Sequence, residues 1–175
     1  AFNTSDLSVA FVCSNIEKNP GDVIFYNDNF FIAHNRKGKV DQFPPFGVFN
    51  DTMGMINIYD NIGNYTQTID FDTTGAGIEN MFLEGANIFA TCHESGYIIN
   101  MDAFDFTFTE DFVDVSDAFE VQSGLLLMAN SNNMLQEYSL SFKVSNDLFA
   151  LPANFTDLKY ENIFDQLMIT STDFA

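Results

Sequence analysis

The stretch Ile88-Phe89-Ala90-Thr91-Cys92 indicates the fold class, because a short apolar run that ends in small polar residues recurs along the chain. The related runs are Phe31-Ile32-Ala33-His34-Asn35, Leu127-Met128-Ala129-Asn130-Ser131 and Leu167-Met168-Ile169-Thr170-Ser171. In chain order, the third residues of the second, third and fourth runs are Ala90, Ala129 and Ile169. Ala129 follows Ala90 by 39 residues, and Ile169 follows Ala129 by 40. A repeat of this length is typical of stacked supersecondary units that bury their apolar faces only against neighbouring units.

On either side of these runs, alternating segments and turn residues indicate further short strands. We predict an all-β chain of 175 residues that forms one domain of antiparallel short-strand repeats. A strand is expected at residues 7–13, and four repeat units are expected at about 23–71, 79–113, 116–146 and 158–171. The last strand of the third unit is predicted at residues 142–144, and the fourth unit is long enough for only two strands.

The first unit is longer than the others, since 57 residues separate Ala33 from Ala90. Residues 36–53 are therefore either an insertion or an additional strand pair. The short fourth unit also leaves two arrangements open. The strand at residues 7–13 could pair with it and close a ring, which removes exposed sheet edges. Edges left open would instead pair between molecules and build a polymer.

The chain resembles β-propeller repeat proteins over residues 23–171. The likeness lies in Ile56-Asn57-Ile58-Tyr59-Asp60 with Gly63, an apolar strand followed by an Asp and a turn glycine, and in the strand groups of the second and third units. The chain has no Trp-Asp dipeptide and no kelch double glycine. The resemblance implies a propeller-like scaffold of about four units whose loops or edges bind a partner. A β-sandwich with open edge strands is the alternative architecture.

The charge restricts the classes of partner. The chain has 25 acidic and six basic residues, for a net charge of −19. Such a charge repels phosphate backbones and anionic membrane surfaces, so we expect no nucleic-acid partner. No apolar stretch approaches the roughly 20 residues that span a bilayer. No cofactor motif is present, and the acidity leaves calcium as the only ion to consider, although no calcium-loop spacing occurs.

Three of the six cations lie together at Arg36, Lys37 and Lys39, and Pro44-Pro45-Phe46 follows them. An acidic copy of the same chain would attract this loop, and Phe46 would add an aromatic anchor. We therefore predict Arg36, Lys37, Lys39 and Phe46 as candidate self-interaction residues. A solvated hairpin tip is the alternative interpretation of the same cluster.

No catalytic constellation is recognisable, so we expect no enzyme. His34 and His93 follow equivalent strands, but their spacing fits no zinc pattern, and we predict no metal ligands. Cys92 and His93 are adjacent, so on a strand their side chains would point to opposite faces and could not form a nucleophile–base pair.

Two features concern cellular location. Asn-x-Ser/Thr sequons occur at Asn3, Asn50, Asn64 and Asn154, and the chain begins at Ala1 rather than methionine. Together they favour an extracellular or cell-surface glycoprotein. Cys13 and Cys92 would then form one disulfide, whereas buried free thiols are the alternative that the sequence leaves open.

Two functional hypotheses follow. The first is a secreted or surface structural protein that self-associates into a filament or another homopolymer through strand edges and the basic loop. The second is a monomeric propeller-like binding module for a glycan, a basic protein or calcium.

Overall fold

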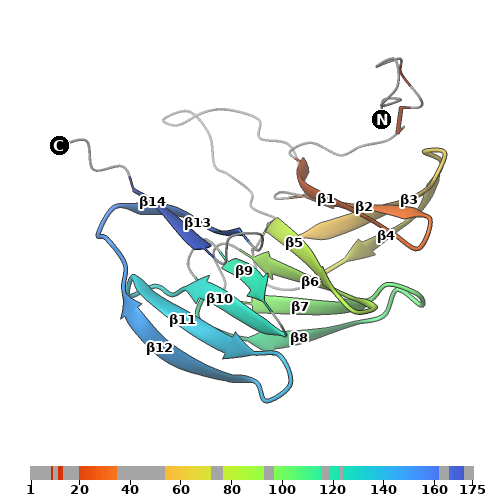
Figure 1. Ribbon diagram of the computed structural model, residues 1–175. Helices are drawn as coiled ribbons and strands as arrows, with labels where there is room; N and C mark the ends of the chain where they lie inside the picture. The colour runs from red at the N-terminus through yellow and green to blue at the C-terminus, as the bar shows by residue number, and fades with distance from the viewer. Residues whose placement is uncertain are drawn as a thin grey trace, which may run out of the picture.

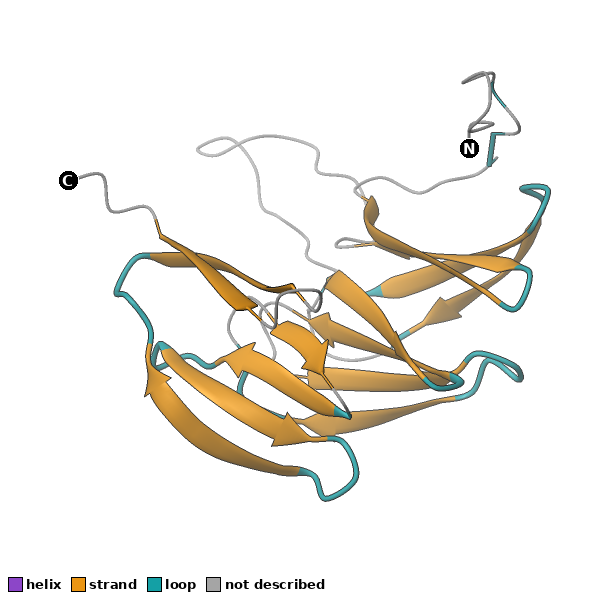
Figure 2. Cartoon of the chain, viewed as in Figure 1, coloured by secondary structure: helices purple, strands orange, loops and turns teal. Residues whose placement is uncertain are grey.

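The computed structural model describes residues 9, 12–13, 20–34, 54–71, 77–92, 97–115, 119–122, 124–161 and 166–171. Every regular element in this part of the chain is a β-strand (Figure 2). The strands are β1 (Pro20–Tyr26), β2 (Asn29–His34), β3 (Met55–Asp60), β4 (Tyr65–Asp70), β5 (Ile78–Glu84), β6 (Asn87–Cys92), β7 (Tyr97–Asp102), β8 (Phe108–Phe112), β9 (Phe119–Gln122), β10 (Leu125–Ala129), β11 (Met134–Ser139), β12 (Val144–Ala150), β13 (Phe155–Glu161) and β14 (Gln166–Ser171).

These strands form four separate sheets in chain order. The first three are antiparallel meanders of four strands, with orders β1-β2-β3-β4, β5-β6-β7-β8 and β9-β10-β11-β12. The fourth contains β13 and β14 alone among the described strands. The predicted fold class of antiparallel short-strand repeats is confirmed. We call the sheets unit 1 to unit 4.

Local chemistry explains the tight connections. Asn27 and Asp28 join β1 to β2 with φ values of 47° and 58°, the left-handed pair that a two-residue hairpin turn requires. Gly85, with φ of 61°, has the same role between β5 and β6. Short turns of this kind hold each strand beside its sequence neighbour, which produces the meander.

Most strands lie close to their expected positions, and β6 and β7 match at both ends. The strand expected at residues 142–144 was misplaced, because β12 begins at Val144 and continues to Ala150. Lys143 has a φ of 56° in the preceding turn, a conformation that ends any strand starting at Phe142. In unit 1, β2 pairs directly with β3. Residues 35–53 and most of the strand expected at 7–13 lie outside the described residues.

The units stack face to face, so each inner sheet is buried on both sides. Along β6, Ile88 and Ala90 pack toward unit 1, whereas the intervening Phe89 packs toward unit 3. A third apolar cluster, which includes Leu135 and Leu158, joins unit 3 to unit 4. This double burial is why the central strands read as continuous apolar runs instead of alternating ones.

The first strand of each unit lies on the inside of the stack. β1 contacts β5, β5 contacts β9, and β9 contacts β13 (Figure 1). The stack therefore curves around its first strands, as blades do in a propeller. Unit 1 and unit 4 are the two ends of this stack, at the upper right and upper left of Figure 1.

Candidate functional site

Unit 4 differs from the other units in its number of strands. β14 has β13 as its only strand partner among the described elements, whereas the second strand of every other unit lies between two neighbours. Its sequence, Gln166–Ser171, contains no charged residue. The outermost strands of units 1, 2 and 3 each carry acidic residues: Asp70 on β4, Glu110 and Asp111 on β8, and Asp147 on β12. Charges on an edge strand oppose pairing with another chain, and β14 lacks this protection.

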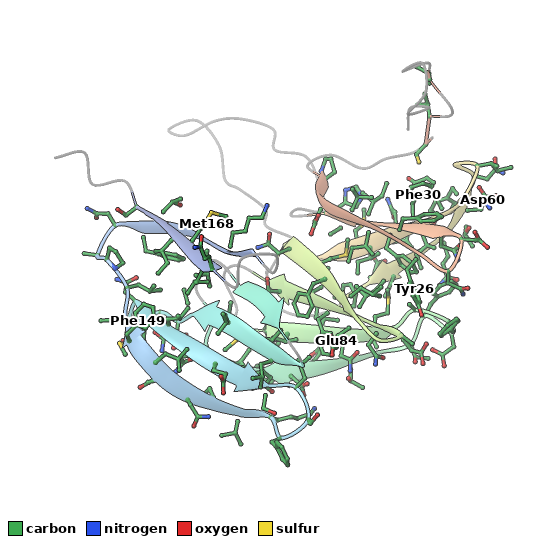
Figure 3. All side chains as sticks on the ribbon, in the orientation of Figure 1. Tyr26, Phe30, Asp60, Glu84, Phe149 and Met168 are labelled. Carbon is green, nitrogen blue, oxygen red and sulfur yellow. The ribbon has the colours of Figure 1, made fainter. Side chains whose placement is uncertain are left out.

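The narrow fourth unit leaves part of unit 3 uncovered. Phe149 on β12 is the register partner of Leu135, so both side chains lie on the face that packs toward unit 4. Leu135 is 1% exposed because β13 and β14 cover it, but Phe149 is 46% exposed. Val144, on the same face of β12, is 53% exposed. Figure 3 shows Phe149 on β12 and Met168 on β14.

The far face of unit 1, at the opposite end of the stack, also exposes apolar side chains. Along β1, Ile24 and Tyr26 pack toward unit 2, whereas the alternate residues Val23 and Phe25 are 57% and 53% exposed. The Phe25 ring lies 4.6 Å from that of Phe30 on β2. The exposed apolar residues are confined to the β1 edge of this face, because Ile32, Met55 and Asn57 on the same face are only 2–7% exposed.

A buried polar chain crosses the same sheet. Asn57 Nδ2 lies 3.2 Å from Nε2 of the fully buried His34, and Asn57 Oδ1 accepts a 2.6 Å hydrogen bond from Thr68 Oγ1. Thr68 Oγ1 is in turn 2.8 Å from the hydroxyl of the exposed Tyr65. The sequence indicated His34 as a turn residue without metal-binding spacing. The structure places it at the end of β2, in a network that orders β2, β3 and β4.

The two cysteines are free thiols in the structure, so the disulfide between them is not formed. Cys92 belongs to the apolar cluster between units 1 and 2, as in the buried-thiol alternative. Burial, and to a lesser extent the charge of Glu110, raises the pKa of the Cys92 thiol to about 12. Burial also raises the pKa of the half-buried Cys13.

The other predicted site residues are placed as follows. Arg36, Lys37, Lys39 and Phe46 lie outside the described residues, as do the sequons at Asn3 and Asn50. Asn64 is exposed in the β3–β4 turn, where its Nδ2 donates a 2.9 Å hydrogen bond to Asp60 Oδ2. Asn154 is exposed in the turn between β12 and β13.

Asp105 and Asp60 accept hydrogen bonds from residues of their own turns. Asp105 Oδ1 accepts hydrogen bonds from the backbone and hydroxyl of Thr107, and these bonds lower the pKa of Asp105. Asp60 accepts bonds from Asn64 and Ile62, and the Asn64 side chain is the largest cause of its lowered pKa. Within the described residues no three metal-ligating side chains gather, and no helix there could span a membrane.

Sequence reasoning did not identify Val23, Phe25, Phe149 or Met168 as surface residues. Val23, Phe25 and Met168 alternate with partly buried apolar residues of the same strands, whereas every residue of β12, including Phe149, is exposed. The strand pattern alone does not say which face a neighbouring unit covers. The one available signal was that only two strands were expected at residues 158–171, which cover less of the neighbouring sheet than four strands would.

Comparisons with known proteins bear on the fold. The sequence matches no protein-family model and no curated protein sequence. Among solved structures, the N-terminal domain of Nup159 is 10% identical, with a TM-score of 0.53 over 81% of this chain and 36% of that domain. This chain therefore spans about a third of the Nup159 domain.

Two computationally designed proteins are also similar in structure. Ika4 has a TM-score of 0.61 at 7% identity and is matched over 94% of this chain and 98% of its own. Ika8 has a TM-score of 0.61 at 9% identity, over 94% of this chain and 46% of its own. These similar structures are propeller proteins, so the chain has a β-propeller-like fold, as its resemblance implied.

Proposed function

We propose that this propeller-like chain is a structural subunit that self-associates, with the β14 edge as the principal contact. The observation that carries the proposal is the two-stranded unit 4, whose outer strand has no further strand beside it among the described elements. Such an edge offers main-chain hydrogen bonds to an added strand, and the exposed Val144 and Phe149 on the unit 3 face that packs toward unit 4 offer apolar contacts. The proposed role requires no catalytic group.

Charge supports the choice of this edge. Two copies, each with a net charge of −19, repel one another over most of their surfaces. Contact is least costly where neither side carries a carboxylate, and β14 is such a strand. The loop with Arg36, Lys37 and Lys39 would add attraction to an acidic neighbour, and that contribution stays a prediction, as does an extracellular location.

Charged substitutions on β14 test the proposal. Gln166 and Ser171 are exposed, and Gln166→Lys with Ser171→Lys would place charges on the edge without altering the core. The matched control is Thr66→Lys with Thr109→Lys, which adds the same charge to the exposed edges of units 1 and 2. We expect electron microscopy and light scattering to show rings or fibres for the native chain and the control, and their loss in the β14 variant.

A uniform particle of 19.7 kDa at every concentration of the native chain would overturn the proposal. That outcome would favour the monomeric binding module instead, and ligand screening would follow. Assemblies that survive equally in the β14 variant and the control would move the contact away from this edge.

A further inference from the structure

We infer that the strand which joins the β14 edge is residues 7–13 of a second copy of this chain, antiparallel to β14 and in the place of a third strand of unit 4. The inference rests on the proposed self-association at β14 and names the segment of the partner that binds there. Pairing of β14 with the β14 strand of another copy is the competing arrangement, so the inference can fail while self-association itself holds.

The place beside β14 lies over the outer part of unit 3. β13 contacts β9, and β14 packs through Leu167 and Ile169 on the cluster that contains Leu135 of β11. A further strand beside β14 would continue in the same direction, toward β12. The face of β12 that is turned toward unit 4 presents Val144 and Phe149, which are 53% and 46% exposed. An added strand would therefore find both a main-chain edge and an apolar surface.

The segment at residues 7–13 suits this place. Its sequence is Leu7-Ser8-Val9-Ala10-Phe11-Val12-Cys13. Neither this segment nor β14 contains a charged residue, so the two can pair although each chain has a net charge of −19. The third strands of the other units, β3, β7 and β11, have six residues each, and the segment is long enough to replace one of them.

Alternation gives the segment a bulky face and a small one. In an extended strand, one face would carry Leu7, Val9, Phe11 and Cys13, and the other would carry Ser8, Ala10 and Val12. The bulky face matches the uncovered apolar surface at Phe149, so we assign it to the side that turns toward unit 3.

The described residues of this segment lie at the opposite end of the stack from β14. Val9 and Val12 belong to none of the four sheets and are 60% and 77% exposed. Cys13 lies near the β3–β4 turn of unit 1: burial is the main cause of the raised pKa of its thiol, and the Asp60 carboxylate of that turn raises it further. Units 1 and 4 are the two ends of the stack (Figure 1). The segment of one copy is therefore placed to reach a neighbour instead of its own β14.

The shape of the stack disfavours pairing between two β14 edges. Unit 3 continues beyond β10 with β11 and β12, whereas unit 4 ends at β14 among the described strands, so the β14 edge is set back from the outer edge of unit 3. The β14 strand of a second copy would carry its own unit 3 with it, and the two β12 strands would meet before the β14 edges could pair. A single segment that belongs to no sheet fits beside β14 without this obstruction.

This mode of pairing sets the form of the assembly. Each copy gives one segment and accepts one, through two different surfaces at opposite ends of the stack. Such a head-to-tail contact continues from copy to copy, into a fibre or into a ring of several copies.

Substitutions at the two exposed valines test the segment. Val9→Lys would place an ammonium group on the face turned toward unit 3, and it should raise the dissociation constant of the assembly by about tenfold or more. Val12→Lys is the matched control, because it makes the same exchange on the opposite face, and its effect should be clearly smaller. Light scattering over a range of concentrations measures both. Equal dissociation constants for the native chain and the two variants would overturn the inference and leave self-association intact.

A mixing experiment separates the two ways of pairing. The Val9→Lys chain keeps its β14 edge, and the Gln166→Lys, Ser171→Lys chain keeps its segment at residues 7–13. Where the native chain assembles, each variant alone should remain at 19.7 kDa, and the equal mixture should form a pair of twice that mass that does not grow. Assembly of the Val9→Lys chain by itself, with no gain on mixing, would establish β14–β14 pairing and overturn the inference. A native chain that is monomeric at every concentration would overturn the proposed function as well.

Cys13 offers a test of the strand direction. In unit 3 the third strand, β11, is antiparallel to β10, and its last residue, Ser139, is the register partner of Val144. An antiparallel segment in unit 4 would end in the same way, with Cys13 toward the Val144 end of β12. Mild oxidation should therefore give disulfide-linked oligomers of a Val144→Cys chain, but not of a Phe149→Cys chain or of the native chain. Cross-linking through Phe149→Cys alone would overturn the antiparallel arrangement.

Discussion

The carboxylate of Asp22 on β1 accepts a 2.7 Å hydrogen bond from the backbone N–H of Met81 on β5. This bond joins the first strands of two neighbouring units on the inside of the stack. Asp22 follows a bulge in β1, and the same kind of bulge precedes Asn80 in β5 and Asp157 in β13. A short polar residue therefore follows the bulge in the first strand of three units.

Removing this acceptor should destabilise the packing of unit 1 on unit 2. We expect Asp22→Ala to lower the free energy of unfolding by about 1–2 kcal/mol, because the part-buried Met81 N–H loses its partner. Asp22→Asn keeps an acceptor oxygen and has the residue type found at Asn80, so its loss should be clearly smaller. Urea denaturation measures both, and equal losses would contradict a role for the bond.

The polar network of unit 1 predicts a second stability effect. Asn57→Ala should cost about 1–3 kcal/mol, because it removes the acceptor of Thr68 and the contact to the buried His34. Thr68→Val removes one bond at a part-buried position and should cost less than Asn57→Ala. Thermal unfolding of the two variants gives the ranking, and the reverse order would argue against Asn57 as the centre of the network.

The cysteines should differ in reactivity. Cys92 is fully buried, whereas Cys13 is half-buried, so a maleimide should modify Cys13 first and Cys92 only after unfolding. The folded pKa of Cys92, about 12, lies above its ordinary value of 9.0, so its contribution to stability is present below pH 9.0 and is lost as the pH rises through about 12. Mass spectrometry of labelled peptides measures the order, and early labelling of Cys92 would contradict its burial.

The β3–β4 turn predicts a specific change in titration. Asn64→Ala removes the largest cause of the lowered pKa of Asp60, so the pKa of Asp60 should rise toward its ordinary value. A lowered carboxylate pKa stabilises the fold above the ordinary value of 3.8 and loses that contribution as the pH falls through the folded pKa. Carboxyl NMR measures the shift, with Thr107→Ala as the control that should move Asp105 and leave Asp60 unchanged.

Much of the architecture was predictable from local chemistry. The run from Ile88 to Cys92 is a strand because its residues are apolar and partly β-branched, and turn residues such as Asn27 and Gly85 set where strands reverse. The turn at Lys143 was not predicted, because its left-handed backbone conformation is uncommon for a lysine and the residue type therefore gave no turn signal.

The strand type and the repeat could be predicted from the sequence alone, because both depend on residues close together in the chain. Which face of each strand is covered depends on how the units pack against one another. Val23 and Ile24 are adjacent and both apolar, yet Ile24 packs on unit 2 and Val23 is exposed, since strand alternation sends them to opposite faces and unit 2 covers one of these faces.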